Sequence, residues 1–104
     1  MGDAVLGHLE DVPDGGARRF DVEGHRIAVV RIGKDVYAIG DRCSHQDYSL
    51  AEGEVDADLC TLECWKHGST FDLRTGEPDT MPATKPVPTY AVRLEGDEIV
   101  VSLP

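Results

Sequence analysis

Apolar and polar residues alternate with a period of two along much of this chain, and short turn signals interrupt them at regular intervals. This pattern is typical of half-buried β-strands. Two runs rich in β-branched residues, Arg26 to Ile32 and Val36 to Ile39, flank a glycine-containing turn and predict a hairpin. A second hairpin is predicted from Thr89 to Glu95 and from Ile99 to Leu103, and Phe20 to Val22 predicts an earlier strand.

We therefore predict an all-β fold and one domain over residues 1–104, a length that can bury a core without disulfides. No segment has clear helical periodicity, although a helical turn over Asp3 to Leu6 stays open. The first strand of the C-terminal hairpin places Tyr90, Val92 and Leu94 on one face. Two irregular regions, 40–50 and 64–88, interrupt the strands, and loops of this kind commonly carry function.

The charge of the chain restricts its partners. Twenty acidic and ten basic residues give a net charge of -10, which argues against nucleic acid and anionic membranes and favours a partner with a basic face. The sequence has no apolar run long enough to span a bilayer and begins without the features of an export signal, so we expect a cytoplasmic protein. Four carboxylates at a spacing of two form either a solvated face or an acidic docking strip; they are Glu52, Glu54, Asp56 and Asp58.

Two of the three cysteines and two of the four histidines form two pairs, Cys43-x-His45 and Cys64-x-x-His67, separated by eighteen residues. Three cysteines cannot all pair, and disulfides are rare in the cytosol, so metal coordination is the first hypothesis. Two facing loops, each with one sulfur and one nitrogen, suit a two-iron cluster with two cysteines on one iron and two histidines on the other. A zinc site is the alternative, although zinc more often takes ligands in another order.

The segments CSH and CWKHGSTFDLRTGEP resemble the two cluster-binding loops of the Rieske-type [2Fe-2S] ferredoxins, especially those that serve bacterial aromatic-ring dioxygenases. TMPATKPVPTYAV resembles the proline-containing third loop of that family. The resemblance implies antiparallel sheets with a small cluster-binding subdomain at one tip, and loops at about 41–50, 63–72 and 78–88. It also implies that Cys43 and Cys64 hold the inner iron, and His45 and His67 the outer iron.

Departures from the high-potential branch of the family predict a low midpoint potential. That branch has an extra cysteine in each loop, joined as a disulfide, where this chain has Tyr48 and Lys66. It also has a tyrosine that donates to a cluster cysteine, where this chain has Phe71. Fewer hydrogen bonds to the sulfurs stabilise the reduced state less. Ser69 is retained, so one donor near a bridging sulfide is expected.

The remaining residues near the motifs have simpler interpretations. Trp65 and Pro82 are expected to shield the cluster, or to form with Tyr48 and Met81 an apolar rim for a partner. Glycines at 68 and 76 are expected to permit tight turns. Cys60 is interpreted as a small buried apolar residue, and the histidines at 8 and 25 as surface residues; the residues expected around the cluster are Trp65, Gly68, Ser69, Phe71 and Pro82.

By this resemblance the chain is a monomeric one-electron carrier, with one Rieske-type [2Fe-2S] cluster, between a flavin-dependent reductase and a terminal non-haem iron oxygenase. It is expected to catalyse no reaction itself, because too few histidines remain for a mononuclear iron site. Three alternatives stay open: the small subunit of an assimilatory nitrite reductase, a role beside iron-sulfur cluster assembly, and a zinc-stapled interaction module.

Overall fold

The structure, a computed structural model, describes residues 2–42, 49–66, 68–78 and 85–103. Strands dominate the described residues, together with two short 3-10 turns, η1 (Leu9–Asp11) and η2 (Leu50–Glu52). The strands are β1 (Gly2–His8), β2 (Gly16–Val22), β3 (His25–Ile32), β4 (Asp35–Gly40), β5 (Glu54–Asp56), β6 (Thr61–Glu63), β7 (Thr70–Asp72), β8 (Thr89–Tyr90), β9 (Val92–Glu95) and β10 (Glu98–Leu103).

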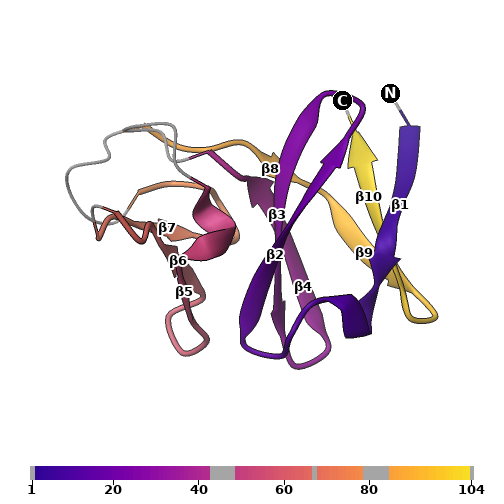
Figure 1. The fold of residues 1–104 in the computed structure, drawn as a ribbon, viewed down its shortest axis with the longest axis horizontal. Coiled ribbons are helices and arrows are strands. Elements are labelled where there is room, and N and C mark those ends of the chain that lie inside the picture. The colour runs from indigo at the N-terminus through magenta and orange to yellow at the C-terminus, as the bar shows by residue number, and fades with distance from the viewer. Residues whose placement is uncertain (1, 43–48, 67, 79–84, 104) are drawn as a thin grey trace.

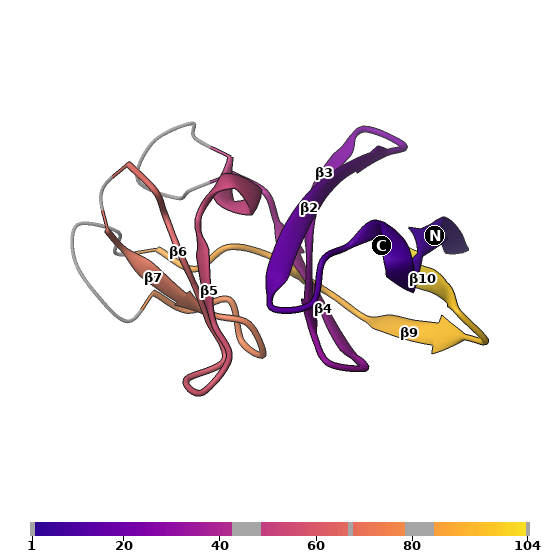
Figure 2. The ribbon, with the colours of Figure 1, turned by 60° about the horizontal axis from the view of Figure 1, so that its bottom comes forward.

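These strands form three antiparallel sheets in a row (Figures 1 and 2). A central sheet has the order β2-β3-β4-β8, a terminal sheet the order β1-β10-β9, and a small sheet the order β5-β6-β7. The small sheet lies at one end of the molecule and the terminal sheet at the other, along the longest dimension of 37 Å (Figure 1). The predicted all-β fold with a small subdomain at one tip is therefore confirmed.

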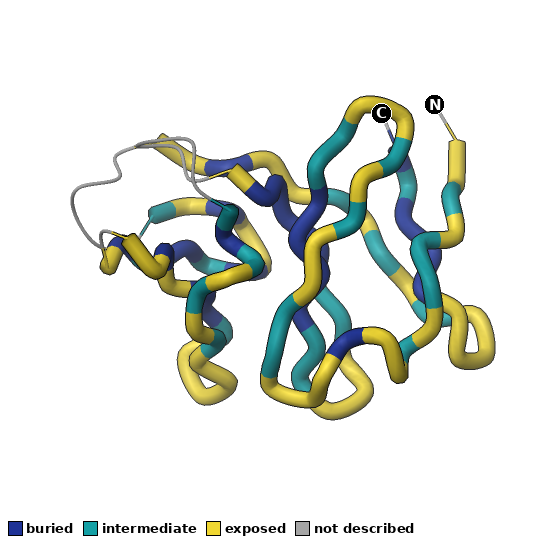
Figure 3. Tube along the Cα trace, in the orientation of Figure 1, coloured by how far each residue is buried: buried dark blue, intermediate teal, exposed yellow. Residues whose placement is uncertain are grey.

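The central sheet is buried on both faces, because successive residues of β3 point to opposite sides. Ala28 and Val30 pack into one core, and Ile27 and Val29 pack into the other. Figure 3 shows the resulting buried stretch through the middle of the molecule. The core toward the small sheet, here called the tip core, consists of Ala28, Val30, Ile39, Leu50, Leu62, Cys64, Phe71, Leu73 and Val87. The base core, toward the terminal sheet, consists of Val12, Ile27, Val29, Ala38, Ile99, Val101 and Leu103.

Both predicted hairpins are confirmed, β3 with β4 and β9 with β10. The second one is interrupted at Ala91, so β8 pairs with β4 in the central sheet while β9 pairs with β10 in the terminal sheet. Tyr90, Val92 and Leu94 nevertheless share one side and pack against the base core, as predicted. The helical turn left open near the N-terminus is wrong: β1 runs through it and pairs with β10.

Within the described ranges, no helix has the length and apolar character that crossing a membrane requires. That all of residues 1–104 belong to one domain stays a prediction.

Candidate metal centre

The described part of the second motif loop is a tight turn between β6 and β7. Cys64 follows β6 directly, and its N–H donates to the carbonyl of Ser69 at 2.7 Å. The N–H of Gly68 donates to the carbonyl of Cys64 at 2.9 Å, which closes the turn. Gly68 has a φ of +76°, a left-handed conformation that other residues rarely adopt. The turn therefore needs this glycine, as the sequence predicted.

Cys64 lies at the inner edge of this turn, in the tip core. Its exposed fraction is 0%, and so are those of Ser69 and Phe71. Trp65, which follows Cys64 in this loop, is different: half of its surface is exposed. The Lys66 ammonium lies 5.8 Å from the centre of the Trp65 ring. This exposure favours the interpretation of Trp65 as part of an apolar rim.

The first loop is described only at its two ends. Cys43, His45 and Tyr48 lie outside the described residues, as does His67 of the second loop. Arg42 and Ser49, which flank the undescribed stretch, pair as an isolated antiparallel β-bridge. The N–H of Leu50 donates to the carbonyl of Asp41 at 2.8 Å. The two ends of the first loop are therefore held side by side.

The third loop is likewise described at its ends, while Met81 and Pro82 lie outside the described residues. At its beginning, Pro78 forms a β-bridge with Phe71 of the second loop. At its end, the N–H of Gly40 donates to the carbonyl of Pro88 at 2.8 Å, next to the first loop. The described ends of the three loops thus lie on the side of the molecule that carries the small sheet (Figure 1).

Gly76 connects the second loop to the end of the third. Its φ is +77°, and its carbonyl accepts a hydrogen bond from the N–H of Val87 at 2.8 Å. A Cβ added at this position would lie 2.1 Å from the carbonyl oxygen of Val87. The close approach explains why a glycine closes this turn, beyond the freedom in φ that the sequence predicted.

The cluster hypothesis can be tested against the part of the site that is described. Cys64 offers a fully buried sulfur in a packed core, and the fully buried Ser69 closes the same turn with it. Thiolate sulfur in an apolar surrounding is the ligand that iron–sulfur clusters take. The described residues contain no group of three or more metal-binding side chains; this is consistent with the prediction, because the other three predicted ligands are not among them.

Two predictions about other residues need correction. His25 is half-buried rather than a surface residue, and its Nδ1 lies 3.2 Å from the Tyr90 hydroxyl. Burial raises the pKa of Tyr90. Cys60 is only half-buried and has a positive φ of 57°. Its thiol forms a hydrogen bond with Tyr37 that, together with burial, raises the pKa of that phenol.

The acidic strip is shorter than the spacing suggested. Of its four residues only Glu54 and Asp56 lie on β5, both exposed, while Glu52 belongs to η2 and Asp58 to a turn. The Asp56 carboxylate is also engaged locally, because it accepts the backbone N–H groups of Asp58 and Leu59. The predicted alignment of all four carboxylates on one strand is therefore wrong; only Glu54 and Asp56 share a strand face.

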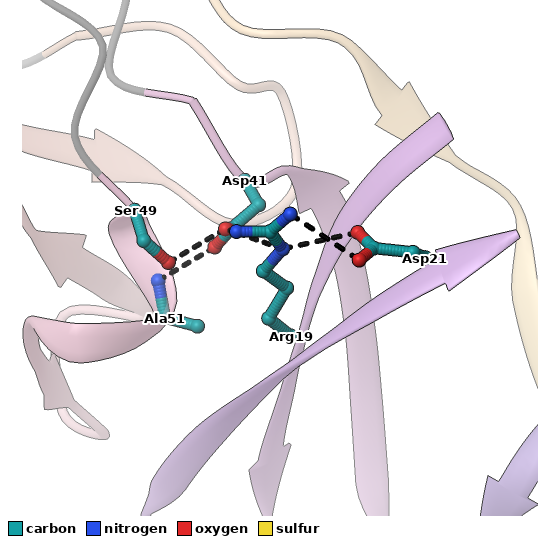
Figure 4. A network of polar contacts seen from close by, with 5 residues as sticks. All are labelled: Arg19, Asp21, Asp41, Ser49 and Ala51. Carbon is teal, nitrogen blue, oxygen red and sulfur yellow. Dashed lines mark hydrogen bonds and ion pairs between the residues drawn. The ribbon is translucent and has the colours of Figure 1, made fainter. Parts of the chain in front are cut away.

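Sequence reasoning missed Asp41. This aspartate is fully buried at the entrance to the first loop and accepts hydrogen bonds from Ser49 and Ala51 (Figure 4). The only signal in the sequence is its position two residues before Cys43. An acidic residue in a loop is usually exposed, so nothing in the pattern predicts its burial.

Comparisons with known proteins identify the family to which the chain belongs. The chain matches the Rieske [2Fe-2S] domain family over residues 3–91. It is 45% identical over 96 residues to the 3-phenylpropionate/cinnamic acid dioxygenase ferredoxin subunit of Escherichia coli K12, covering 92% of this chain and 89% of the relative.

Two solved structures are similar throughout. One is the ferredoxin of carbazole 1,9a-dioxygenase from Nocardioides aromaticivorans IC177, with a TM-score of 0.93, 37% identity and 98% coverage of both chains. The other is a chain of the complex of reduced oxygenase and oxidised ferredoxin in carbazole 1,9a-dioxygenase, with a TM-score of 0.86 and 34% identity. The match covers 96% of this chain and 92% of that one.

Proposed function

Because this chain belongs to the Rieske [2Fe-2S] domain family and has one Rieske-type cluster, we propose that it is the ferredoxin of an aromatic-ring dioxygenase system. It carries single electrons to a terminal oxygenase and is not itself the catalytic component. Its similarity to dioxygenase ferredoxins extends over nearly the full length of both chains. A ferredoxin in complex with an oxygenase is among its structural relatives.

The observation that carries the proposal is the turn after β6, where Cys64 is buried in the tip core and the loop is closed through Gly68. We assign Cys43 and Cys64 to one iron and His45 and His67 to the other, following the family pattern. When bound, the cluster supplies a site that accepts and releases one electron.

The protein's own residues determine how well that site works. The tip core keeps water from Cys64, whose own exposed fraction is 0%. Low polarity around a cluster and few hydrogen-bond donors to its sulfurs both lower its reduction potential, because both stabilise the more negative, reduced state less. Phe71 brings no hydroxyl to this core. We therefore expect a midpoint near the lower end of the Rieske range of roughly -150 to +300 mV, and a value above about +100 mV would contradict this expectation.

We further propose that the electron donor is a flavin-dependent reductase and that the carrier is a cytoplasmic monomer. The net charge of -10 favours partners with basic faces. The exposed pair Glu54 and Asp56 on β5 lies on the same small sheet as the cluster loops and suits such docking. Reversing both charges to lysine should slow electron transfer to the partner at low salt and change it little at high salt. If the variant and the wild type transfer electrons at equal rates at low salt, this pair is excluded as a docking site.

The first test is spectroscopic. Anaerobically purified protein should be red-brown with two irons per chain, and reduction by dithionite should give a rhombic EPR signal of low average g. A colourless protein with one zinc would reject the proposed function and leave a structural staple instead. Co-purification with a large subunit would point to the nitrite reductase alternative, and impaired cluster assembly in a deletion strain to the assembly role.

A further inference from the structure

Asp41 is a fully buried ionisable side chain, with an exposed fraction of 0%. It follows β4 directly and is the first residue of the first cluster-binding loop. A buried carboxylate is unfavourable unless hydrogen bonds compensate for its lost hydration. The contacts that compensate here indicate what this residue does.

Its two carboxylate oxygens accept hydrogen bonds from the far end of the same loop (Figure 4). The Ser49 hydroxyl donates to Oδ2 at 2.6 Å, and the N–H of Ala51 donates to Oδ1 at 2.8 Å. The backbone adds two bonds: Leu50 donates to the carbonyl of Asp41 at 2.8 Å, and Asp41 donates to the carbonyl of Arg26 at 2.9 Å. One residue thus joins both ends of the loop to the central sheet.

Arg19 on β2 connects this network to the edge of the central sheet. Its Nε lies 3.7 Å from Oδ2 of Asp41. The same guanidinium donates to Asp21, from Nε to Oδ1 at 3.0 Å and from Nη2 to Oδ2 at 3.2 Å (Figure 4). The Arg19 side chain is 42% exposed, so solvent weakens its pair with Asp41. The short bonds from Ser49 and Ala51 therefore define the position of Asp41 more than the arginine does.

We propose that Asp41 is a positioning residue for the cluster: it holds together the two ends of the first loop, between which the predicted ligands Cys43 and His45 lie in the sequence. This inference rests on the ligand assignment of the proposed function. Asp41 acts through the loop, and a loop whose ends are fixed loses less conformational entropy when its ligands bind. Residues that orient metal ligands typically change metal affinity 10- to 100-fold when they are replaced.

The test compares the rate of cluster loss to an iron chelator in the cluster-loaded protein. Asp41→Ala removes both side-chain acceptors and should increase this rate about 10- to 100-fold. Asp41→Asn should stay within about threefold of wild type, because the amide oxygen accepts from Ala51 and the amide nitrogen donates to the Ser49 hydroxyl, through neutral bonds in place of charge-assisted ones. A near wild-type rate of cluster loss in Asp41→Asn would separate the positioning role from the effect of the negative charge.

Ser49→Ala offers a second variant if Asp41→Ala fails to fold. It removes one bond of the clamp without changing any charge, and should give a smaller increase in the same rate. The EPR signal of the reduced cluster should broaden in Asp41→Ala and recover in Asp41→Asn, a signature that a general loss of stability does not produce.

Asp14→Ala is the control. The exposed Asp14 carboxylate accepts the backbone N–H of Gly33 at 2.8 Å, and Gly33 lies at the opposite end of β4 from the first loop. Replacing Asp14 should leave cluster loss and the EPR signal unchanged. Unchanged cluster loss in both Asp41→Ala and Ser49→Ala would overturn the proposal, and so would an asparagine variant as impaired as the alanine variant. A wild-type protein without a cluster would instead reject the proposed function.

Discussion

Replacing Phe71 by tyrosine should raise the midpoint potential of the cluster. The phenylalanine is fully buried on β7 and shares the tip core with Cys64. A tyrosine hydroxyl added here cannot reach bulk water and must find a partner in this core. High-potential members of the family have a tyrosine at this position that donates to a cluster cysteine, so the sulfur of Cys64 is the expected acceptor.

The magnitude follows from one hydrogen bond. A net contribution of about 0.5 to 1.5 kcal/mol that is stronger in the reduced state corresponds to a rise of about 20 to 65 mV for a one-electron couple. If the hydroxyl finds no partner, Phe71→Tyr should instead lower the free energy of unfolding by about 1 to 3 kcal/mol and leave the potential unchanged.

The assay is a redox titration followed by EPR, with thermal unfolding measured on the same samples. Phe20→Tyr is the matched control, because Phe20 packs against the base core, on the other side of the central sheet, and its variant should keep the wild-type potential. A folded Phe71→Tyr protein with an unchanged or lowered potential would refute the expected hydrogen bond to the cluster.

Two further predictions concern stability. Gly76→Ala should lower the free energy of unfolding by about 2 to 4 kcal/mol. The alanine would have to adopt a positive φ, and its Cβ would lie 2.1 Å from the Val87 carbonyl oxygen. Gly96→Ala, with a positive φ but nothing within 4 Å, should cost only about 1 to 2 kcal/mol in chemical denaturation; equal costs would exclude the steric contribution. Hydrogen bonds from Arg93 and Ser102 lower the pKa of the Asp3 carboxyl, so its stabilising effect is present above the ordinary value of 3.8 and is lost as the pH falls through the lowered folded-state pKa. Asp3→Asn should therefore make thermal unfolding less dependent on pH below about pH 4; an unchanged acid slope would show that this pair is not coupled to folding.

Much of the strand structure could be predicted because its cause is local. In the β3–β4 hairpin, two runs rich in β-branched residues flank a turn at Gly33, which has a positive φ, so neighbouring residues are enough to predict both strands and the turn. The first strand was harder. Its residues 3–6 allow a helical turn, and only their pairing with β10, at the other end of the sequence, makes them a strand.

The break at Ala91 could not be predicted either. The residues around it continue one alternating pattern, and Tyr90, Val92 and Leu94 do share a side. Which partner strand each segment joins depends on the positions of β4 and β10 in three dimensions. Alternation determines the face of a residue but not the sheet to which it belongs.

The order of residues along the chain is enough to indicate the family, the all-β architecture and the two Cys/His pairs, because all three depend on residue types at fixed intervals. The tertiary structure decided which side chains are buried together around the loop ends. Cys64 and Phe71 share a core because their strands pair. Asp41 can be buried because Ser49 and Ala51, at the other end of the loop, donate hydrogen bonds to its carboxylate. Burial is a property of what surrounds a residue in space, so a buried carboxylate and a solvated one have the same appearance in the sequence.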